Sequence, residues 1–281
     1  MKLATVRRGD RRFPACLEND VVREFDAPDL RTVLSLTPRE RVARLTDRRY
    51  PVHEVAFEAP LVPPRNVFCV GRNYREHVAE GARAVGREPR MPEVPAFFTK
   101  VPQAIVGPEA TIHLDSRVSS EYDYEAELAV VIGARCKDVA QDRAPDVVAG
   151  YTCANDVTAR DLQRAHGQWF KGKSLDESCP LGPWIVTAGE LPDPQNLRIT
   201  FRLDGEIRQE STTARMIFPV ARIIAELSRG MTLLPGDVIL TGTPDGVGFA
   251  RTPPSFLRDG QVMEVEIEGI GLLRNRVEIR P

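Results

Sequence analysis

The chain has 281 residues, with 38 lysines and arginines against 40 aspartates and glutamates and a formal net charge of −2 at pH 7. This length can bury a full hydrophobic core, and the near-neutral balance gives no overall basic field for nucleic acid. No apolar run approaches the length of a membrane span, and the first residues lack the apolar region of a signal peptide. The five cysteines are scattered without a Cys-x-x-Cys pair, so we expect reduced thiols and a cytoplasmic protein.

Residues 1–62 are predicted to form a small N-terminal α/β unit of their own. Thr37 fits the N-cap of a short helix, since threonine there accepts from a backbone N–H of the first turn. The proline-rich run 60–64 is a stiff connector and marks the boundary to a second domain, 63–281. The strands predicted for the first unit cover 3–7, 13–17 and 21–25, and its two short helices cover 29–36 and 37–45.

The second domain opens with a buried strand over 66–71 and a short helix over 72–81. We expect Asn73 to cap this helix and Gly81 to end it. Residues 82–95 are rich in arginine, glycine and proline, a composition typical of a mobile surface segment. This segment is therefore a candidate flap beside the helix.

His77 and Glu80 are three residues apart and thus neighbours on one face of that helix. A carboxylate beside a histidine fixes the tautomer of the ring and raises its basicity, which suits a general base. The same spacing is also typical of an ordinary surface ion pair. Lys100, further along the chain, either meets a substrate carboxylate or is simply solvated.

The most informative stretch is 122–133, in which a run of Val, Ile and Leu closing on glycine is typical of a buried strand. Residues two apart in a strand share a face, so Glu125 and Glu127 point the same way. A third acid, Asp156, follows the apolar run 147–154. A bound cation would relieve the repulsion among three such carboxylates, and an all-oxygen set favours Mg²⁺ first, then Mn²⁺ or Ca²⁺. A solvated edge with ordinary salt bridges is the alternative.

Residues 167–174 satisfy the phosphate-loop pattern G-x-x-x-x-G-K-[ST]. A phosphate loop must follow a strand and open a helix, but here the preceding segment is a predicted helix beginning at 158. The loop also holds Trp169 and Phe170, and later prolines block a long helix. We therefore predict no nucleotide site and keep Lys173 as a cation near the acids.

The last third of the chain is predicted to be rich in strands. A loop of small residues, 241–248, follows a short strand and suits close approach of backbone and hydroxyl groups to an anionic ligand. An ordinary tight loop is the alternative. The strands predicted here cover 183–188, 197–203, 206–209, 238–240, 262–267 and 272–279, and a helix with an apolar stripe covers 216–227.

Five of these stretches, in this order, resemble the motifs of the fumarylacetoacetate hydrolase family, in its branch of acylpyruvate hydrolases and 2-hydroxyhepta-2,4-diene-1,7-dioate isomerases. Their span is roughly 65–279. The resemblance implies an α+β fold with a β-rich mixed core, a sandwich or roll with flanking helices, beside a small N-terminal unit. The matching stretches are Gly71-Arg72-Asn73-Tyr74 with His77 and Glu80, Tyr124-Glu125-Ala126-Glu127-Leu128, 155–163, Gly172-Lys173-Ser174, and Thr241-Gly242-Thr243-Pro244.

The resemblance also implies how the site is built. It assigns a Mg²⁺ or Mn²⁺ ion to Glu125, Glu127 and Asp156, and places His77 and Glu80 on a flap where they act on water. It further implies a small 2-oxo acid as substrate and a homodimer as the assembly. The remaining site residues that it implies are Lys173, as a catalytic cation, and Arg72, Tyr74, Gln163 and Thr243, as substrate contacts.

The resulting hypothesis is a metal-dependent hydrolase that cleaves a C–C bond of an acylpyruvate. His77 would deprotonate the attacking water, and Lys173 would stabilise the negative oxygen. Oxaloacetate decarboxylation, isomerisation of a 2-hydroxy-diene-dioate and dehydration of a sugar acid are alternatives that share the enolate chemistry. A non-catalytic binding protein is a further alternative, although binding alone requires no base.

Overall fold

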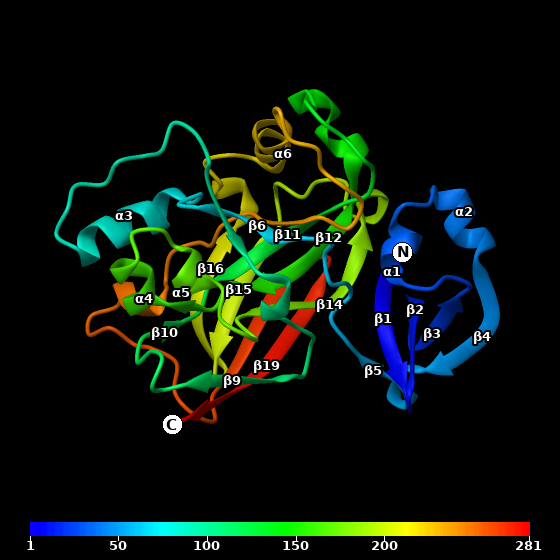
Figure 1. The fold of residues 1–281 in the computed structure, drawn as a ribbon, viewed down its shortest axis with the longest axis horizontal. Coiled ribbons are helices and arrows are strands. Elements are labelled where there is room, and N and C mark those ends of the chain that lie inside the picture. Colours follow the sequence, from blue (N-terminus) through cyan, green and yellow to red (C-terminus); the bar gives the residue numbers. More distant parts are fainter.

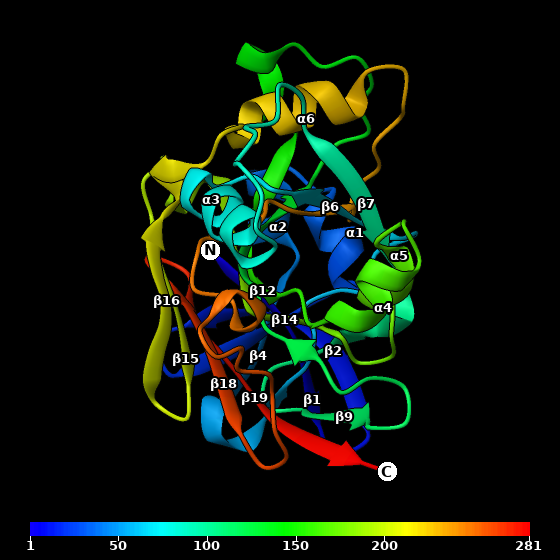
Figure 2. The same ribbon diagram turned by 90° about the vertical axis from the view of Figure 1, so that its left-hand side faces the viewer.

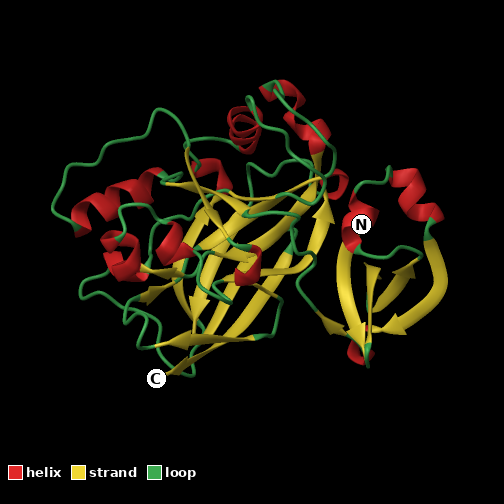
Figure 3. Ribbon diagram, viewed as in Figure 1, coloured by secondary structure: helices red, strands yellow, loops and turns green.

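The computed structural model describes all residues from 1 to 281 (Figure 1). Strands make up most of its regular structure, and the few helices are short (Figure 3). None of these helices combines the length and apolar character needed to cross a membrane. The helices are α1 (Leu30–Leu34), α2 (Pro38–Ala43), α3 (Arg75–Ala84), α4 (Arg160–Ala165), α5 (Phe170–Lys173) and α6 (Val220–Ser228). The strands are β1 (Lys2–Arg8), β2 (Arg11–Glu18), β3 (Val21–Phe25), β4 (Leu45–Pro51), β5 (Ala56–Phe57), β6 (Val67–Gly71), β7 (Ala96–Lys100), β8 (Ile105–Val106), β9 (Thr111–Asp115), β10 (Tyr122–Asp123), β11 (Ala126–Ile132), β12 (Val148–Asn155), β13 (Thr158–Ala159), β14 (Cys179–Thr187), β15 (Arg198–Leu203), β16 (Glu206–Thr212), β17 (Val238–Leu240), β18 (Val262–Ile267) and β19 (Gly271–Arg280).

Two large sheets organise the chain. A 12-stranded mixed sheet runs in the order β4-β3-β2-β1-β14-β12-β11-β17-β6-β7, with β5 and β8 attached beside it. A 5-stranded sheet runs in the order β16-β15-β18-β19-β9, and its strands lie side by side in Figure 2. This arrangement confirms the predicted α+β class with a β-rich mixed core.

The N-terminal strands β1 to β4 lie to one side of the main body (Figure 1). They join the large sheet through antiparallel pairing of β1 with β14, at Lys2 and Leu3. Helix α2 in this unit begins as predicted, because Thr37 accepts from the backbone N–H of Glu40 while the Glu40 carboxylate accepts from that of Thr37. The domain boundary at 62/63 stays a prediction.

Strand β11 is central in the large sheet and is buried along its whole length. Its alternate residues Leu128 and Val130 join the core cluster that contains Phe201 and Val265 of the smaller sheet. The residues between them, such as Ala129, join a second cluster on the opposite face. Because side chains alternate along a strand, Glu127 lies on the Ala129 face, away from the smaller sheet.

Two local predictions for the first helix of the second domain are wrong. Helix α3 begins at Arg75 with no side-chain cap, because the Asn73 amide is buried and donates to the backbone oxygens of Phe218 and Thr241 instead. Gly81 does not end the helix, which continues to Ala84. The first error arises where tertiary contacts override a local sequence preference.

Candidate functional site

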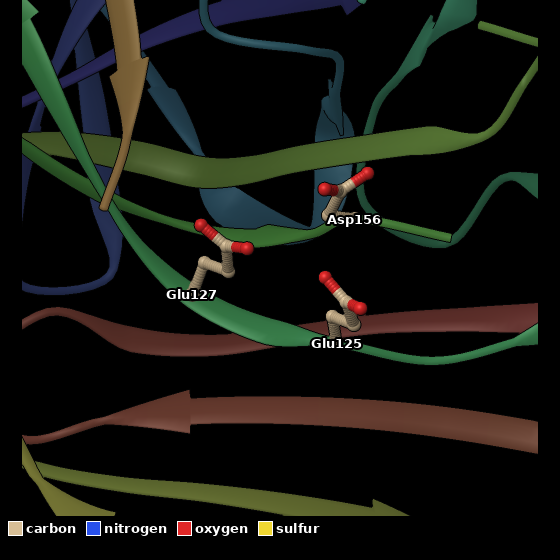
Figure 4. A group of neighbouring side chains, drawn as sticks. All are labelled: Glu125, Glu127 and Asp156. Carbon is tan, nitrogen blue, oxygen red and sulfur yellow. The ribbon is translucent and has the colours of Figure 1, made fainter. Parts of the chain in front are cut away.

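Three carboxylates converge at one end of β11 and β12. Glu125 and Glu127 flank the first residue of β11, and Asp156 directly follows β12, whose Asn155 pairs with Ala126. Ligand oxygens of the three acids lie within 4.8 Å of one another, and all three residues are buried (Figure 4). The structure therefore brings the predicted acid cluster together.

Two buried lysines hold this cluster. Lys173 Nζ donates to Glu125 Oε2 and to Asp156 Oδ2, both at 2.7 Å. Lys100 Nζ donates to the other Asp156 oxygen at 2.7 Å and to the Val157 carbonyl at 3.1 Å. Lys100 is fully buried, so the alternative of a solvated side chain is wrong. In this structure it pairs with one of the protein's own acids.

Arg160 and Asp123 extend the cluster, and sequence reasoning gave neither of them a role. Arg160 Nε donates to Asp123 Oδ2 at 2.9 Å. Its Nη2 lies 2.6 Å from Glu125 Oε1, as an ion-pair contact without hydrogen-bond alignment. The guanidinium carbon lies 4.5 Å from the ring centre of Phe249. The sequence contained one signal for Asp123, because this residue continues the two-residue spacing of Glu125 and Glu127.

The cluster holds more buried carboxyl groups than buried cationic side chains. Burial and then the nearby charges of Asp156 and Glu125 raise the pKa of Glu127 well above its usual value. Burial also disfavours the charge of Glu125, but Lys173 and Arg160 outweigh this and lower its pKa to about 2. The buried carboxylates are Asp123, Glu125, Glu127 and Asp156, and the buried cationic side chains are Lys100, Arg160 and Lys173.

These observations fit a divalent metal ion. The three converging side chains offer only oxygen atoms, the donor type that Mg²⁺, Mn²⁺ and Ca²⁺ prefer. An excess of buried carboxylate over buried cation is costly, and a bound cation would remove the excess. The Lys173 ammonium already bridges two of the three acids, which shows that this space stabilises positive charge.

A single loop, residues 241–249, donates backbone N–H groups to three carboxylates from three segments. Gly242 N donates to Glu127 Oε2 at 2.6 Å, and Gly246 N donates to Glu80 Oε2 at 2.9 Å. Gly248 N donates to Asp123 Oδ1 at 2.7 Å. Gly246 has φ +102°, and a Cβ there would lie 2.1 Å from the Arg208 carbonyl oxygen, so only glycine fits. These N–H groups thus serve the protein's own acids.

The predicted His–Glu pair is present on α3. His77 Nδ1 lies 2.9 Å from Glu80 Oε1, and both side chains are largely buried, with exposed fractions of 13% and 12%. Because a carboxylate accepts and Gly246 N fixes its other oxygen, we assign the ring hydrogen to Nδ1. Nε2 then carries the lone pair and is the nitrogen available to a ligand. A proton on the second ring nitrogen would lower the pKa of Glu125 through its charge, which places the His77 ring near the acid cluster.

The four predicted substrate contacts lie in different surroundings. Thr243 is buried and its hydroxyl accepts from Gln209 Nε2 at 2.8 Å, while Gln163 Oε1 accepts from Arg160 Nη1 at 3.1 Å. The Tyr74 side chain is fully buried and its hydroxyl has no hydrogen-bond partner. Arg72 is exposed, and its guanidinium carbon lies 5.6 Å from the ring centre of Trp169.

The residues that match the phosphate-loop pattern do not form a loop that opens a long helix, because they contain the short helix α5. Within 167–174, helix α5 has 4 residues and ends at Lys173, whose ammonium is taken by carboxylates. Gly172 has a packing role, since a Cβ there would lie 2.5 Å from Gln163 N on α4. The match to the pattern therefore reflects close packing of α4 and α5 beside the acid cluster.

Comparison with known proteins gives a consistent result. Residues 66–278 match the family model described as "Fumarylacetoacetate (FAA) hydrolase C-terminal". The chain is 44% identical over 229 residues to the oxaloacetate tautomerase YisK of Bacillus subtilis, an alignment covering 81% of this chain and 75% of that protein. Two solved structures match across the whole chain. They are a fumarylacetoacetate hydrolase from Exiguobacterium antarcticum, at TM-score 0.87, 39% identity and 100% coverage of both chains, and a 2-hydroxyhepta-2,4-diene-1,7-dioate isomerase from Mycobacterium marinum, at TM-score 0.81, 37% identity and coverage of 100% of this chain and 99% of that one.

Proposed function

Because this chain belongs to the fumarylacetoacetate hydrolase family, we propose that it is an enzyme that interconverts the keto and enol forms of a small 2-oxo diacid. Oxaloacetate is the first substrate to test, since a relative at 44% identity is named an oxaloacetate tautomerase. The observation that carries the proposal is the oriented His77–Glu80 pair beside a buried cluster of three acids. Together they supply a base and a cation site, which are the parts that enolisation needs.

Glu125, Glu127 and Asp156 would hold the divalent cation, with Mg²⁺ as the proposed ion. When bound, the cation supplies Lewis-acid polarisation of the oxygens of the 2-oxo acid. His77 Nε2 takes the proton from C3, and the electron pair of that C–H bond becomes the C2–C3 double bond of the enolate. Glu80 stabilises the imidazolium, and the positive charge of Lys173 stabilises the negative charge of the enolate. The enolate oxygen takes up a proton from solvent and His77 releases the C3 proton to solvent, so the net change is an isomerisation.

Acylpyruvate hydrolysis is the second candidate, and the same His77–Glu80 pair favours it. A histidine whose Nδ1 is held by a carboxylate suits the activation of water as well as the removal of a C–H proton. The two reactions differ in their products. Hydrolysis breaks a C–C bond and releases pyruvate and an acid, whereas tautomerisation releases nothing.

The test uses the purified protein with Mg²⁺ and two substrates, enol oxaloacetate and an acylpyruvate panel. We expect the ultraviolet absorbance of enol oxaloacetate to decay faster than in buffer, without release of pyruvate. His77→Gln should lower this rate about a hundred- to ten-thousand-fold, while His166→Gln, at an exposed histidine, should leave it unchanged. If the protein releases pyruvate from an acylpyruvate with a higher kcat/KM than it shows for oxaloacetate, acylpyruvate hydrolysis replaces tautomerisation as the proposed function. An unchanged rate in His77→Gln would remove the base from both mechanisms.

A further inference from the structure

Gln209 is the one buried residue of an otherwise accessible strand. Strand β16 lies at the edge of the 5-stranded sheet, and Gln209 is only 1% exposed. Its register places Gln209 opposite Phe201 but Ile207 opposite Arg202, so Arg208 is an extra residue that forms a β-bulge. Bulges turn a side chain away from the regular alternation, and they occur often beside active sites. Here the bulge accompanies a polar side chain that points into the molecule.

The hydrogen bonds of Gln209 join the acid strand to the 241–249 loop. Its Oε1 accepts from Ala126 N at 3.0 Å, and its Nε2 donates to Thr243 Oγ1 and to the Pro244 carbonyl, both at 2.8 Å. A backbone N–H only donates and a carbonyl only accepts, so the orientation of the amide is fixed. Ala126 is the residue between Glu125 and Glu127. One side chain therefore spans from the centre of the acid pair to Thr243.

The same contacts decide what the Thr243 hydroxyl can do. Its oxygen already accepts from Gln209, and no protein group accepts its hydrogen. Thr243 is 2% exposed, so this hydrogen lies in a buried environment where an unmade hydrogen bond is costly. A ligand with an anionic oxygen would satisfy it, because a hydrogen bond from a hydroxyl to a carboxylate is short and strong.

We propose that Gln209 is a positioning residue that orients the Thr243 hydroxyl as a hydrogen-bond donor to a substrate carboxylate. It couples that donor to the spacing of Glu125 and Glu127 through Ala126 N. The inference rests on the proposed function for the chemistry of the ligand, a 2-oxo acid. The inference goes beyond the proposed function because it assigns recognition of the carboxylate to a chain of hydrogen bonds. This chain starts at Gln209 on β16, the edge strand of the 5-stranded sheet.

The test measures binding of oxalate, a dicarboxylate with the planar shape of an enolised 2-oxo acid, by calorimetry in Mg²⁺. Gln209→Met and Thr243→Val should each weaken oxalate binding about tenfold or more, as expected for the loss of one hydrogen bond to a charged group. The double variant should bind oxalate about as weakly as either single variant, since both changes break the same chain of hydrogen bonds. Thermal unfolding in EDTA reports whether each variant stays folded.

Gln195→Met is the matched control. Gln195 also forms hydrogen bonds with three groups, the Thr213 carbonyl, Met216 Sδ and Val220 N, but with none of the site residues. It should lose thermal stability with no change in oxalate affinity. Additive losses in the double variant, equal affinities for Gln209→Met and Gln195→Met, or no oxalate binding by the wild type would each overturn the inference.

The outcome is separable from that of the proposed function, because oxalate binding requires no turnover. Coupled losses of affinity in a protein that does not convert oxaloacetate would support the positioning role and reject the tautomerase. For an active enzyme, kinetics add a second readout. Gln209→Met should raise KM more than it lowers kcat, and Gln195→Met should leave KM unchanged.

Discussion

The Lys100–Asp156 pair gives a quantitative prediction for the free energy of unfolding. Both side chains are fully buried, and Nζ lies 2.7 Å from Oδ1. Substituting methionine for Lys100 keeps most of the aliphatic stem but leaves Asp156 Oδ1 without its partner. Removal of one member of a buried ion pair typically costs about 3–5 kcal/mol, because the remaining charge is uncompensated.

Lys173 still contacts Asp156 Oδ2 in this variant, so we take the lower value, about 3 kcal/mol. In a domain of this size, 1 kcal/mol shifts Tm by about 2–4 °C. Lys100→Met should therefore lower Tm by about 6–12 °C. The assay is calorimetric unfolding in EDTA, so that no bound cation compensates for the missing ammonium.

Lys137→Met is the matched control, at a lysine that is 52% exposed with Nζ 4.0 Å from Asp138 Oδ2. Exposed pairs contribute about 0–1 kcal/mol, so its Tm should stay within about 4 °C of the wild type. If Lys100→Met unfolds at the same temperature as Lys137→Met, the Lys100–Asp156 contact does not stabilise the fold and the reasoning fails.

Further predictions concern the metal, the flap, the thiols and the nucleotide site. Glu127→Gln should stabilise the protein in EDTA, because it removes a repelled buried carboxylate, and should abolish the rise in Tm caused by Mg²⁺; a persistent rise would exclude Glu127 as a ligand. Hydrogen exchange over 76–92 should slow when Mg²⁺ and oxalate are added, and equal rates would argue against a flap. A thiol reagent at pH 8 should label half-buried Cys136 first, because the other four thiols are buried; uniform labelling would contradict this burial. ATP should not shift Tm, and a shift lost in Lys173→Ala would restore the phosphate-loop interpretation.

Several features that sequence reasoning predicted correctly depend on local spacing. The face shared by Glu125 and Glu127 follows from the two-residue period of a strand, and the contact of His77 with Glu80 follows from the turn of a helix. The cap at Thr37 is equally local. In each case the partners lie within three residues of each other, so the backbone geometry alone brings them together.

The features that were missed depend on partners far apart in the chain. Lys100 meets Asp156 across 56 residues, and nothing near Lys100 in the sequence distinguishes a buried from a solvated side chain. Gln209 meets Thr243 across 34 residues, from a strand whose alternation is broken by a bulge. Residues 45–51 form strand β4 because they pair with β3, and no clear strand period predicts this pairing. Register and burial of this kind are decided by the packed fold.

The 241–249 loop links three parts of the site that lie far apart in the chain. Its backbone N–H groups fix Glu127 of the acid cluster, Glu80 of the His–Glu pair and Asp123, the partner of Arg160. A shift of the loop would therefore change the proposed metal site, the proposed base and the buried Arg160–Asp123 ion pair at the same time. Residues that share such a support are coupled, so the effects of substitutions in the three groups should not be additive. The glycine at 246 allows this arrangement, because any larger residue would press on the bulge that holds Gln209 in place.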